Sequence, residues 1–223
     1  MIAGCQGEVD TFDPPYSALE EPISERVDAV EAATTPTPRL GPISEIFDCV
    51  READAMFIAS HRGGPARGYP ENAIETLEHA TSEGIVIHEI DVVESRDGVL
   101  FLLHDRTLGR TTTGDCAVAD SVWADIQGLN LKDNFGSITN FKPPKLSDVL
   151  LWARAIQGIV ELDKKPTTSF RNIISHVRAA EAEEHVILIT YNDSQAIEVA
   201  RLAPELVLTA SGDSAAHQRE LEA

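Results

Sequence analysis

The sequence lacks any apolar segment of the ~18–20 residues that a membrane-spanning helix needs. It is also poor in cysteine: Cys5, Cys49 and Cys116 are its three cysteines, and their spacing fits no zinc site. Basic residues are scarce as well, since 18 lysines and arginines stand against 37 aspartates and glutamates, for a formal net charge of -19. Nucleic acids are bound through basic patches that release counterions, so this charge argues against a nucleic-acid partner and against unaided docking to an anionic membrane.

The excess of carboxylates is suited instead to holding a divalent cation through oxygen ligands. The chain has 223 residues, of which 43% are hydrophobic, which is enough for a sizeable core in one large or two small domains.

The first forty-five residues differ in composition from the rest. They are acidic and rich in proline, and such a segment does not bury enough apolar surface to fold alone. The opening residues, ending in Cys5, resemble the end of a bacterial lipoprotein signal, with an ordinary N-terminus as the alternative. We therefore predict a tether over residues 1–45 with a membrane anchor through Cys5, a folded domain over residues 46–223 and an extracytoplasmic location. In an exported protein, Cys49 and Cys116 are candidates for a disulfide.

Beyond the tether, strand and helix signals alternate. Strands are predicted at 55–60, 85–92, 99–103, 158–163, 185–190 and 205–210, and helices at 71–83, 146–157, 167–181 and 193–202. Such alternation implies a parallel sheet, either open and doubly wound or closed into a barrel. The long connection over residues 106–145 interrupts the rhythm with loop signals and one short helix near 121–127, and a loop of this length usually shapes substrate access.

Ionisable residues follow several of the predicted strands. His61 ends the first apolar run, Glu89 and Asp91 end the second, and His104 ends the third. In α/β proteins the strand ends carry the site, so we expect these side chains to converge. Two imidazoles and two carboxylates are suited to metal-assisted acid–base chemistry.

A series of short motifs in order along the chain resembles the glycerophosphodiester phosphodiesterase family over about residues 56–190. The motifs are His61-Arg62-Gly63, Pro70-Glu71-Asn72, Glu89-Ile90-Asp91, Asp97-Gly98, His104-Asp105, Arg110-Thr111-Thr112 and Asp163-Lys164-Lys165-Pro166. The resemblance implies a TIM-type (β/α) barrel with its site at the carboxyl ends of the strands. It also implies metal-dependent hydrolysis of glycerophosphodiesters to glycerol 3-phosphate and an alcohol, with one divalent cation, Mg²⁺ or Ca²⁺.

The resemblance also assigns roles to individual residues. Glu89 and Asp91 would bind the metal, and their i, i+2 spacing on a strand puts both side chains on one face. His61 and His104 would form the acid–base pair, since imidazole titrates near neutrality and serves either role. Arg62 would bind phosphate oxygens.

Three further residues complete the predicted site. Lys165 would be a second phosphate contact. Glu71 and Asn72 would support the loop that carries His61, with simple helix capping as the alternative.

The third metal carboxylate departs from the family pattern. The segment Leu162–Thr167 aligns with a hydrophobic-Glu-x-Lys-Pro-Thr pattern, which puts Asp163 where the family has glutamate. Glu161 is the alternative because it lies on the same strand face. We predict Asp163 as the ligand, with a shifted metal or a water making up for the missing methylene.

Six strands are predicted, whereas a TIM-type barrel has eight, so the sequence predicts an incomplete barrel with about six of eight βα units. Two alternatives to the leading function follow. One is a phosphodiesterase of the lysophospholipase D or sphingomyelinase D type. The other is a truncated, non-catalytic domain that binds metal or phosphate.

Overall fold

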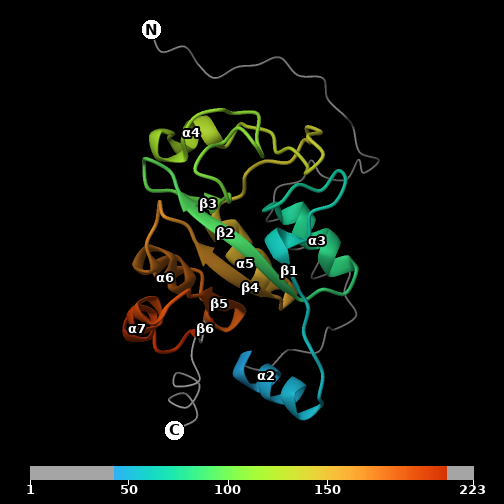
Figure 1. Cartoon of the computed structure of the whole chain (residues 1–223), viewed down its shortest axis with the longest axis vertical. Helices are drawn as coiled ribbons and strands as arrows, with labels where there is room; N and C mark the ends of the chain where they lie inside the picture. Colours follow the sequence, from blue (N-terminus) through green and yellow to red (C-terminus); the bar gives the residue numbers. More distant parts are fainter. Residues whose placement is uncertain (1–42, 210–223) are drawn as a thin grey trace.

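The computed structural model describes residues 43–209, and its centre is a six-stranded sheet (Figure 1). Five strands run parallel in the order β1-β2-β4-β5-β6, and β3 pairs antiparallel with β2. The strands are β1 (Ala59–Ser60), β2 (Ile87–Glu94), β3 (Leu100–Leu102), β4 (Ile159–Lys164), β5 (Val186–Ile189) and β6 (Val207–Thr209). Each of them overlaps a strand that the sequence predicts.

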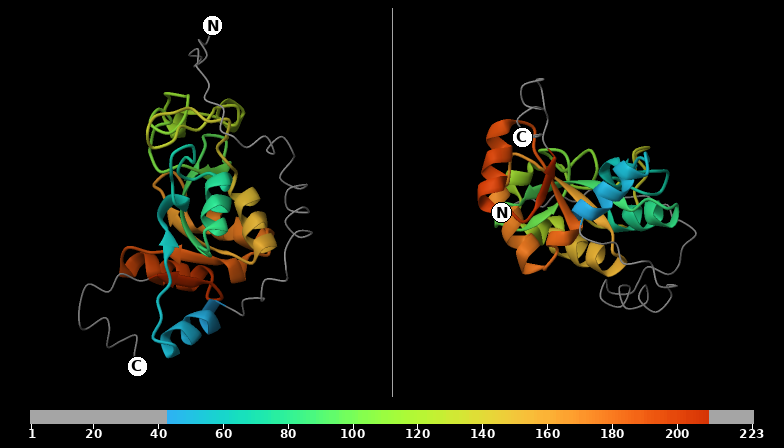
Figure 2. Two further views of the ribbon diagram at one scale, coloured as in Figure 1. Left: turned by 90° about the vertical axis from the view of Figure 1, so that its right-hand side faces the viewer. Right: turned by 90° about the horizontal axis from the view of Figure 1, so that it is seen from below.

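Four helices pack on one face of the sheet (Figure 2). They are α3 (Ile74–Ser82), α5 (Leu146–Ile156), α6 (Phe170–Ala179) and α7 (Asp193–Leu202), and each overlaps a predicted helix. Their apolar residues form the main core with the strand residues that face them, such as Ile90, Leu162 and Leu188. Full burial of a side chain of this size contributes about 1.5–3 kcal/mol. This core fixes which strand residues face the helices and therefore which face the other way.

The opposite face of the sheet begins with an apolar layer and continues with acidic residues. Ile87, Ile159 and Ile187 pack together at the start of their strands, and α2 (Ile43–Glu52) covers them through Ile43 and Ile46. In Figure 1, α2 lies below the sheet, at the end opposite to the long loop that carries α4 (Trp123–Ile126). The amino ends of the strands are thus closed by α2, which the sequence did not predict.

The direction of β3 determines how many of the six predicted strands run parallel. Gly98 has a φ of 86°, and the backbone N–H of Ser95 donates to the carbonyl of Val99 over 3.0 Å, which closes a tight turn between β2 and β3. An Asp-Gly pair between two apolar runs is a hairpin signal. All six predicted strands are present, but β3 returns along β2 instead of extending the parallel sheet, so five of them run parallel among the described residues.

The predicted incomplete barrel is confirmed in its main features. The parallel strands carry their helices on one face, and β1 and β6 are the two ends of the strand order and do not pair with each other. Within residues 43–209, no helix combines the length and the apolar character that crossing a membrane requires.

Several predictions concern residues outside the described range. Cys5 and the tether lie there, except for residues 43–45, which belong to α2. The predicted extracytoplasmic location rested on the same segment. Cys49 and Cys116 are within the described part of the chain, and both are exposed thiols that form no disulfide with each other.

His88 lies on the helix-facing side of β2 and is a structural residue. Its ring is fully buried, within 2.8 Å of the Ser60 hydroxyl through Nδ1 and within 3.1 Å of the Thr81 hydroxyl through Nε2. Trp152 packs against it in an edge-to-face contact with a centroid separation of 5.5 Å. Burial lowers the pKa of His88 from the ordinary 6.5 to about 4, so the imidazole is neutral near neutral pH.

The protein should lose stability as the pH falls from about 6.5 towards 4. In that window the unfolded chain binds a proton at His88 that the folded chain does not, so the free energy of unfolding decreases, by about 3 kcal/mol across the whole window. Urea unfolding at pH 7, 6 and 5 measures this effect. A His88→Gln variant should be less stable at pH 7 but change less with pH, and an equal loss in both proteins would contradict the assignment to His88.

Candidate active site

Three carboxylates gather on the face of the sheet that the helices leave uncovered. Glu89 and Asp91 belong to β2 and Asp163 belongs to β4, and the parallel register sets Asp91 beside Asp163. One carboxylate oxygen from each residue lies within 4.8 Å of the others. Asp91 and Asp163 are buried and Glu89 is partly buried. The structure thus brings the three predicted metal ligands into one cluster.

The cluster has the chemistry of a site for a hard divalent cation. Burial, together with the negative charges of Asp91 and Asp163, raises the pKa of Glu89 to about 7, against the lowering effects of a hydrogen bond from the Arg62 backbone and of the charge of Lys165. The Oδ1 atom of Asp163 is buried and has no hydrogen-bond partner. A bound cation would weaken the repulsion that raises the pKa of Glu89 and would give the unpaired buried oxygen of Asp163 a partner, and oxygen ligands suit Mg²⁺ or Ca²⁺.

Glu161 lies one step deeper in the sheet, opposite Glu89 on the neighbouring strand. It is half-buried, and burial raises its pKa, but it is not a member of the carboxylate cluster. The geometry therefore favours Asp163 over Glu161 as the third ligand, as the sequence predicts.

Asn72 holds Asp91 through two hydrogen bonds. Its side-chain nitrogen donates to Oδ2 of Asp91 over 2.8 Å, and its side-chain oxygen accepts from the Asp91 backbone N–H over 2.9 Å. The Asn72 backbone has a φ of 60°, and its N–H donates to the carbonyl of Arg62 over 3.0 Å. Asn72 therefore connects strand β2, which carries Glu89 and Asp91, to the loop that carries His61.

The His61-Arg62-Gly63 turn brings His61 close to the cluster. Arg62 and Gly63 have φ values of 52° and 84°, and a Cβ at Gly63 would lie 2.8 Å from the side chain of Leu77, so glycine is required there. The turn directs the Arg62 backbone N–H to Glu89 Oε2 over 2.7 Å. His61 Nε2 lies 3.9 Å from the same oxygen, and its side chain is 75% exposed. His61 is thus beside the cluster and open to a substrate.

His104 is connected to the same site by a chain of charged side chains. Its Nδ1 lies 2.7 Å from Oδ1 of Asp105, and Arg110 donates to both oxygens of Asp105. Hydrogen bonds from Arg110 hold the pKa of Asp105 at about 2 despite partial burial, so this carboxylate accepts and the imidazole donates through Nδ1. The hydrogen bond to Asp105 thus involves Nδ1 of His104 and not Nε2.

Glu71 joins this chain to Arg62. It is 3% exposed and accepts from Arg110 over 2.7 and 2.9 Å and from Arg62 over 3.1 and 3.2 Å. The side chain of Arg62 also brings Nε to 3.7 Å from Oδ2 of Asp91, and this buried Nε has no hydrogen-bond partner. Glu71 and Asn72 therefore do more than cap a helix, because their side chains fix the groups around the cluster.

Lys165 bridges two of the clustered carboxylates. Its Nζ lies 2.6 Å from Asp91 Oδ1 and 2.6 Å from Asp163 Oδ2. Burial lowers its pKa, but the bonds to these carboxylates outweigh that effect, so the net pKa is above its ordinary value and the ammonium is charged. Lys165, which the family resemblance implies as a phosphate contact, thus lies within the carboxylate cluster and has Asp91 and Asp163 as its partners.

The long loop over residues 106–145 lies at the carboxyl ends of the strands (Figure 1). Asp133 is buried within it and accepts from the backbone N–H groups of Phe135 and Ser137. Its second oxygen accepts from the N–H of Gly68 over 2.9 Å, which ties the long loop to the segment after His61. Two loops at the carboxyl end are therefore fixed to each other beside the site.

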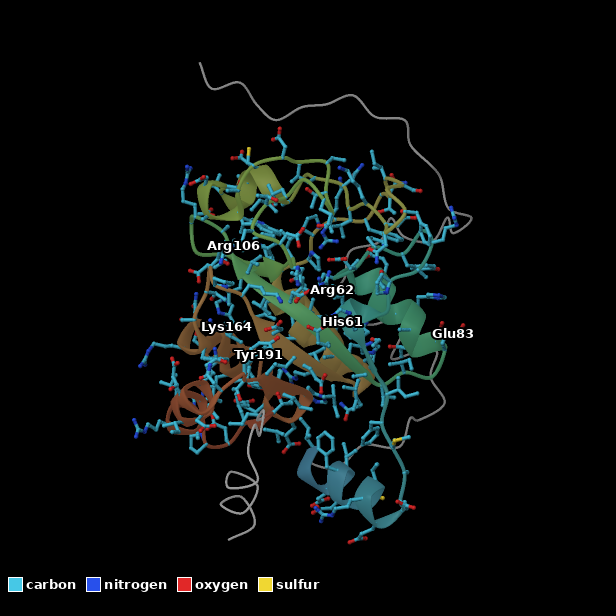
Figure 3. The ribbon with its side chains drawn as sticks, viewed as in Figure 1. His61, Arg62, Glu83, Arg106, Lys164 and Tyr191 are labelled. Carbon is cyan, nitrogen blue, oxygen red and sulfur yellow. The ribbon has the colours of Figure 1, made fainter. Side chains whose placement is uncertain are left out.

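Three further residues contact the site: Asp105 and Arg110 belong to the family motifs but were given no role, and Tyr191 was not identified from the sequence. Tyr191 follows β5, and its hydroxyl donates to Asp163 Oδ2 over 2.8 Å. It lies across the sheet from His61 and Arg62 (Figure 3). Burial, followed by the hydrogen bond to Asp163, raises the pKa of Tyr191, so its hydroxyl stays protonated and donates. Its position at the carboxyl end of a strand was the one signal that pointed to it.

Known proteins share this arrangement of elements. The sequence model described as the Glycerophosphoryl diester phosphodiesterase family matches residues 61–212. A glycerophosphoryl diester phosphodiesterase from Parabacteroides distasonis is 30% identical and superposes with a TM-score of 0.70 over 88% of this chain and 63% of that one. A glycerophosphodiester phosphodiesterase from Agrobacterium tumefaciens is 26% identical, with a TM-score of 0.59 over 69% of this chain and 65% of that one.

A curated relative shows the same similarity in sequence. The glycerophosphodiester phosphodiesterase of Caldanaerobacter subterraneus is 28% identical over 155 residues, which are 67% of this chain and 63% of the relative. The chain thus spans less than two thirds of the length of these relatives.

Proposed function

The chain belongs to the glycerophosphoryl diester phosphodiesterase family, and on that premise we propose that it hydrolyses glycerophosphodiesters to glycerol 3-phosphate and an alcohol with one bound Mg²⁺ or Ca²⁺. The observation that carries this proposal is the carboxylate cluster with an exposed imidazole beside it. Three carboxylate oxygens lie within 4.8 Å of one another, and His61 Nε2 is 3.9 Å from Glu89.

In the proposed reaction, Glu89, Asp91 and Asp163 hold the cation. A divalent cation polarises the phosphoryl oxygens and offsets the negative charge of the transition state. Phosphodiester hydrolysis also needs one group that takes a proton from the nucleophile and one that gives a proton to the leaving oxygen. His61 and His104 are proposed for these two roles.

Arg62 and Lys165 are proposed to bind the phosphate. The Nε of Arg62 has no hydrogen-bond partner, and a guanidinium is suited to bind phosphate oxygens through two parallel N–H donors. Lys165 contributes its positive charge from its place between Asp91 and Asp163. Neither side chain needs to give up its carboxylate partners to bind the phosphate, since an ammonium and a guanidinium each have several N–H donors.

The purified chain should release glycerol 3-phosphate from glycerophosphocholine when Mg²⁺ or Ca²⁺ is present and stop when EDTA is added. Coupled detection of glycerol 3-phosphate measures this, with lysophosphatidylcholine assayed in parallel. Faster release of choline from lysophosphatidylcholine would favour the lysophospholipase D alternative. Full turnover in EDTA would contradict a metal-dependent reaction, and a folded chain that binds metal without turnover would support the non-catalytic alternative.

A further inference from the structure

We propose that Tyr191 is a positioning residue of the cation site: its hydroxyl holds one oxygen of Asp163 so that the other faces the cation. This inference rests on the proposed metal site. In the proposed site, Asp163 is the third ligand and Tyr191 holds its carboxylate in place. The family resemblance expects a glutamate at the position of Asp163. The test must therefore separate the role of Tyr191 from the existence of the site.

The hydrogen bonds of Asp163 are distributed unevenly between its two oxygens. The Tyr191 hydroxyl donates to Oδ2 over 2.8 Å, and Lys165 Nζ lies 2.6 Å from the same atom. Oδ1 is buried and has no partner. Leaving a buried acceptor unsatisfied costs roughly 1–3 kcal/mol, so a carboxylate that turns this oxygen inward is arranged for a ligand that the protein itself does not supply.

The length of the side chain explains why a holding residue is needed. Asp163 is one methylene shorter than glutamate, so its carboxylate reaches less far from β4 and has to present one particular oxygen. Rotation of the carboxylate about its last bond is broad and shallow in energy unless a partner fixes it. Lys165 alone does not fix it firmly, because its ammonium is shared with Asp91 at the same distance of 2.6 Å. Tyr191, which follows the neighbouring strand β5, provides a second donor to the same oxygen.

Tyr191 is suited to a test by a conservative change. The residue is 56% exposed, so removal of its hydroxyl creates no cavity in the core. A Tyr191→Phe variant keeps the ring and loses only the donor to Asp163. Tyr69→Phe is the matched control, since Tyr69 also follows a loop near the site but interacts through its ring, which stacks on His79 with a centroid separation of 4.1 Å.

Isothermal titration of the full chain with Mg²⁺, and separately with Ca²⁺, measures the dissociation constant without reference to activity. We expect Tyr191→Phe to weaken binding by about 10-fold, in line with the effect of removing partners that orient metal ligands, and Tyr69→Phe to leave it unchanged. In an Asp163→Glu background, the longer carboxylate should need no such partner, and Tyr191→Phe should change the dissociation constant by less than about 2-fold. At saturating cation, the turnover of Tyr191→Phe should return close to that of the parent.

Three results would overturn the inference. The first is a dissociation constant that Tyr191→Phe leaves unchanged while the parent chain binds the cation. The second is an equal loss of affinity whether Tyr191→Phe is made in the parent chain or in the Asp163→Glu background. The third is a change in KM for the phosphodiester without a change in cation affinity, which would make Tyr191 a substrate contact. A parent chain that binds neither cation is distinguishable from all three, because it removes the proposed metal site itself.

Discussion

Replacing Asp91 by asparagine should lower metal-dependent turnover of glycerophosphocholine by about 10³-fold or more. Asp91 is 1% exposed, and both of its oxygens are engaged, Oδ1 with Lys165 at 2.6 Å and Oδ2 with Asn72 at 2.8 Å. Asparagine has the same size but lacks the charge that a hard cation needs, and it leaves Lys165 with one carboxylate fewer. A bound cation contributes several kcal/mol to the transition state, and each ~1.4 kcal/mol is a factor of ten in rate.

The measurement is kcat/KM at saturating Mg²⁺ or Ca²⁺, together with the cation dissociation constant. Asp120→Asn is the matched control because it makes the same chemical change at an exposed position. Circular dichroism checks that both variants fold. A folded Asp91→Asn protein that turns over within about tenfold of the parent would remove Asp91 from the proposed ligand set.

The carboxylate cluster was predictable because local rules determine it. Alternation along a strand puts Glu89 and Asp91 on one face, and parallel strands end at the same edge of a sheet. For the third carboxylate, the sequence left Glu161 as an alternative to Asp163. The register between β2 and β4 sets Asp163 beside Asp91, and Asp163 is the member of the cluster. The two-residue repeat therefore accounts for the placement of Glu89 and Asp91 on one face, whereas the prediction of Asp163 came from the family resemblance.

The direction of β3 and the presence of α2 do not follow from this two-residue repeat. An apolar run such as Leu100–Leu102 reads the same whether it pairs parallel or antiparallel, and the turn at Gly98 decides between the two. Helix α2 is mostly exposed, and its role depends on the isoleucine layer that it covers at the far end of the sheet. Both features depend on partners that are distant in sequence or on a single turn.

The sequence alone also does not show which side chains the charged groups contact. Arg110 is six residues from His104 along the chain, yet it connects Asp105 to Glu71, which is thirty-nine residues before it. Tyr191 reaches Asp163 across twenty-eight residues. The family motifs include Arg110 without indicating its partners, and they do not include Tyr191, so only coordinates show these contacts.

Substitution of either proposed catalytic histidine should lower kcat by about 10²–10⁴-fold, the usual contribution of general acid–base catalysis. His61→Asn removes the exposed imidazole that lies 3.9 Å from Glu89. His104→Asn removes the imidazole whose Nδ1 is held at 2.7 Å by Asp105, with Nε2 left to exchange a proton. The cation dissociation constant should change little in either variant, because neither histidine belongs to the carboxylate cluster.

The control for these variants is His176→Asn. His176 lies on α6, and its Nδ1 contacts the carbonyl of Asn172 within the same helix at 3.0 Å, so the change should leave kcat unaltered. A His61→Asn or His104→Asn protein that is folded, binds the cation and keeps the parent turnover would contradict the role of that histidine.

The nature of the leaving group separates the acid from the base. A choline alkoxide needs a proton as it leaves, whereas an aryl oxide such as p-nitrophenolate leaves without one. The variant that lacks the acid should therefore recover most of its lost rate with glycerol 3-phosphate p-nitrophenyl ester, while the variant that lacks the base should stay slow with both substrates. Because Asp105 and Arg110 keep the proton of His104 on Nδ1, Nε2 of that ring is an acid when charged and a base when neutral. The comparison of the two esters thus assigns the protonation state of His104 at the moment of reaction, and with it the role that is left to His61.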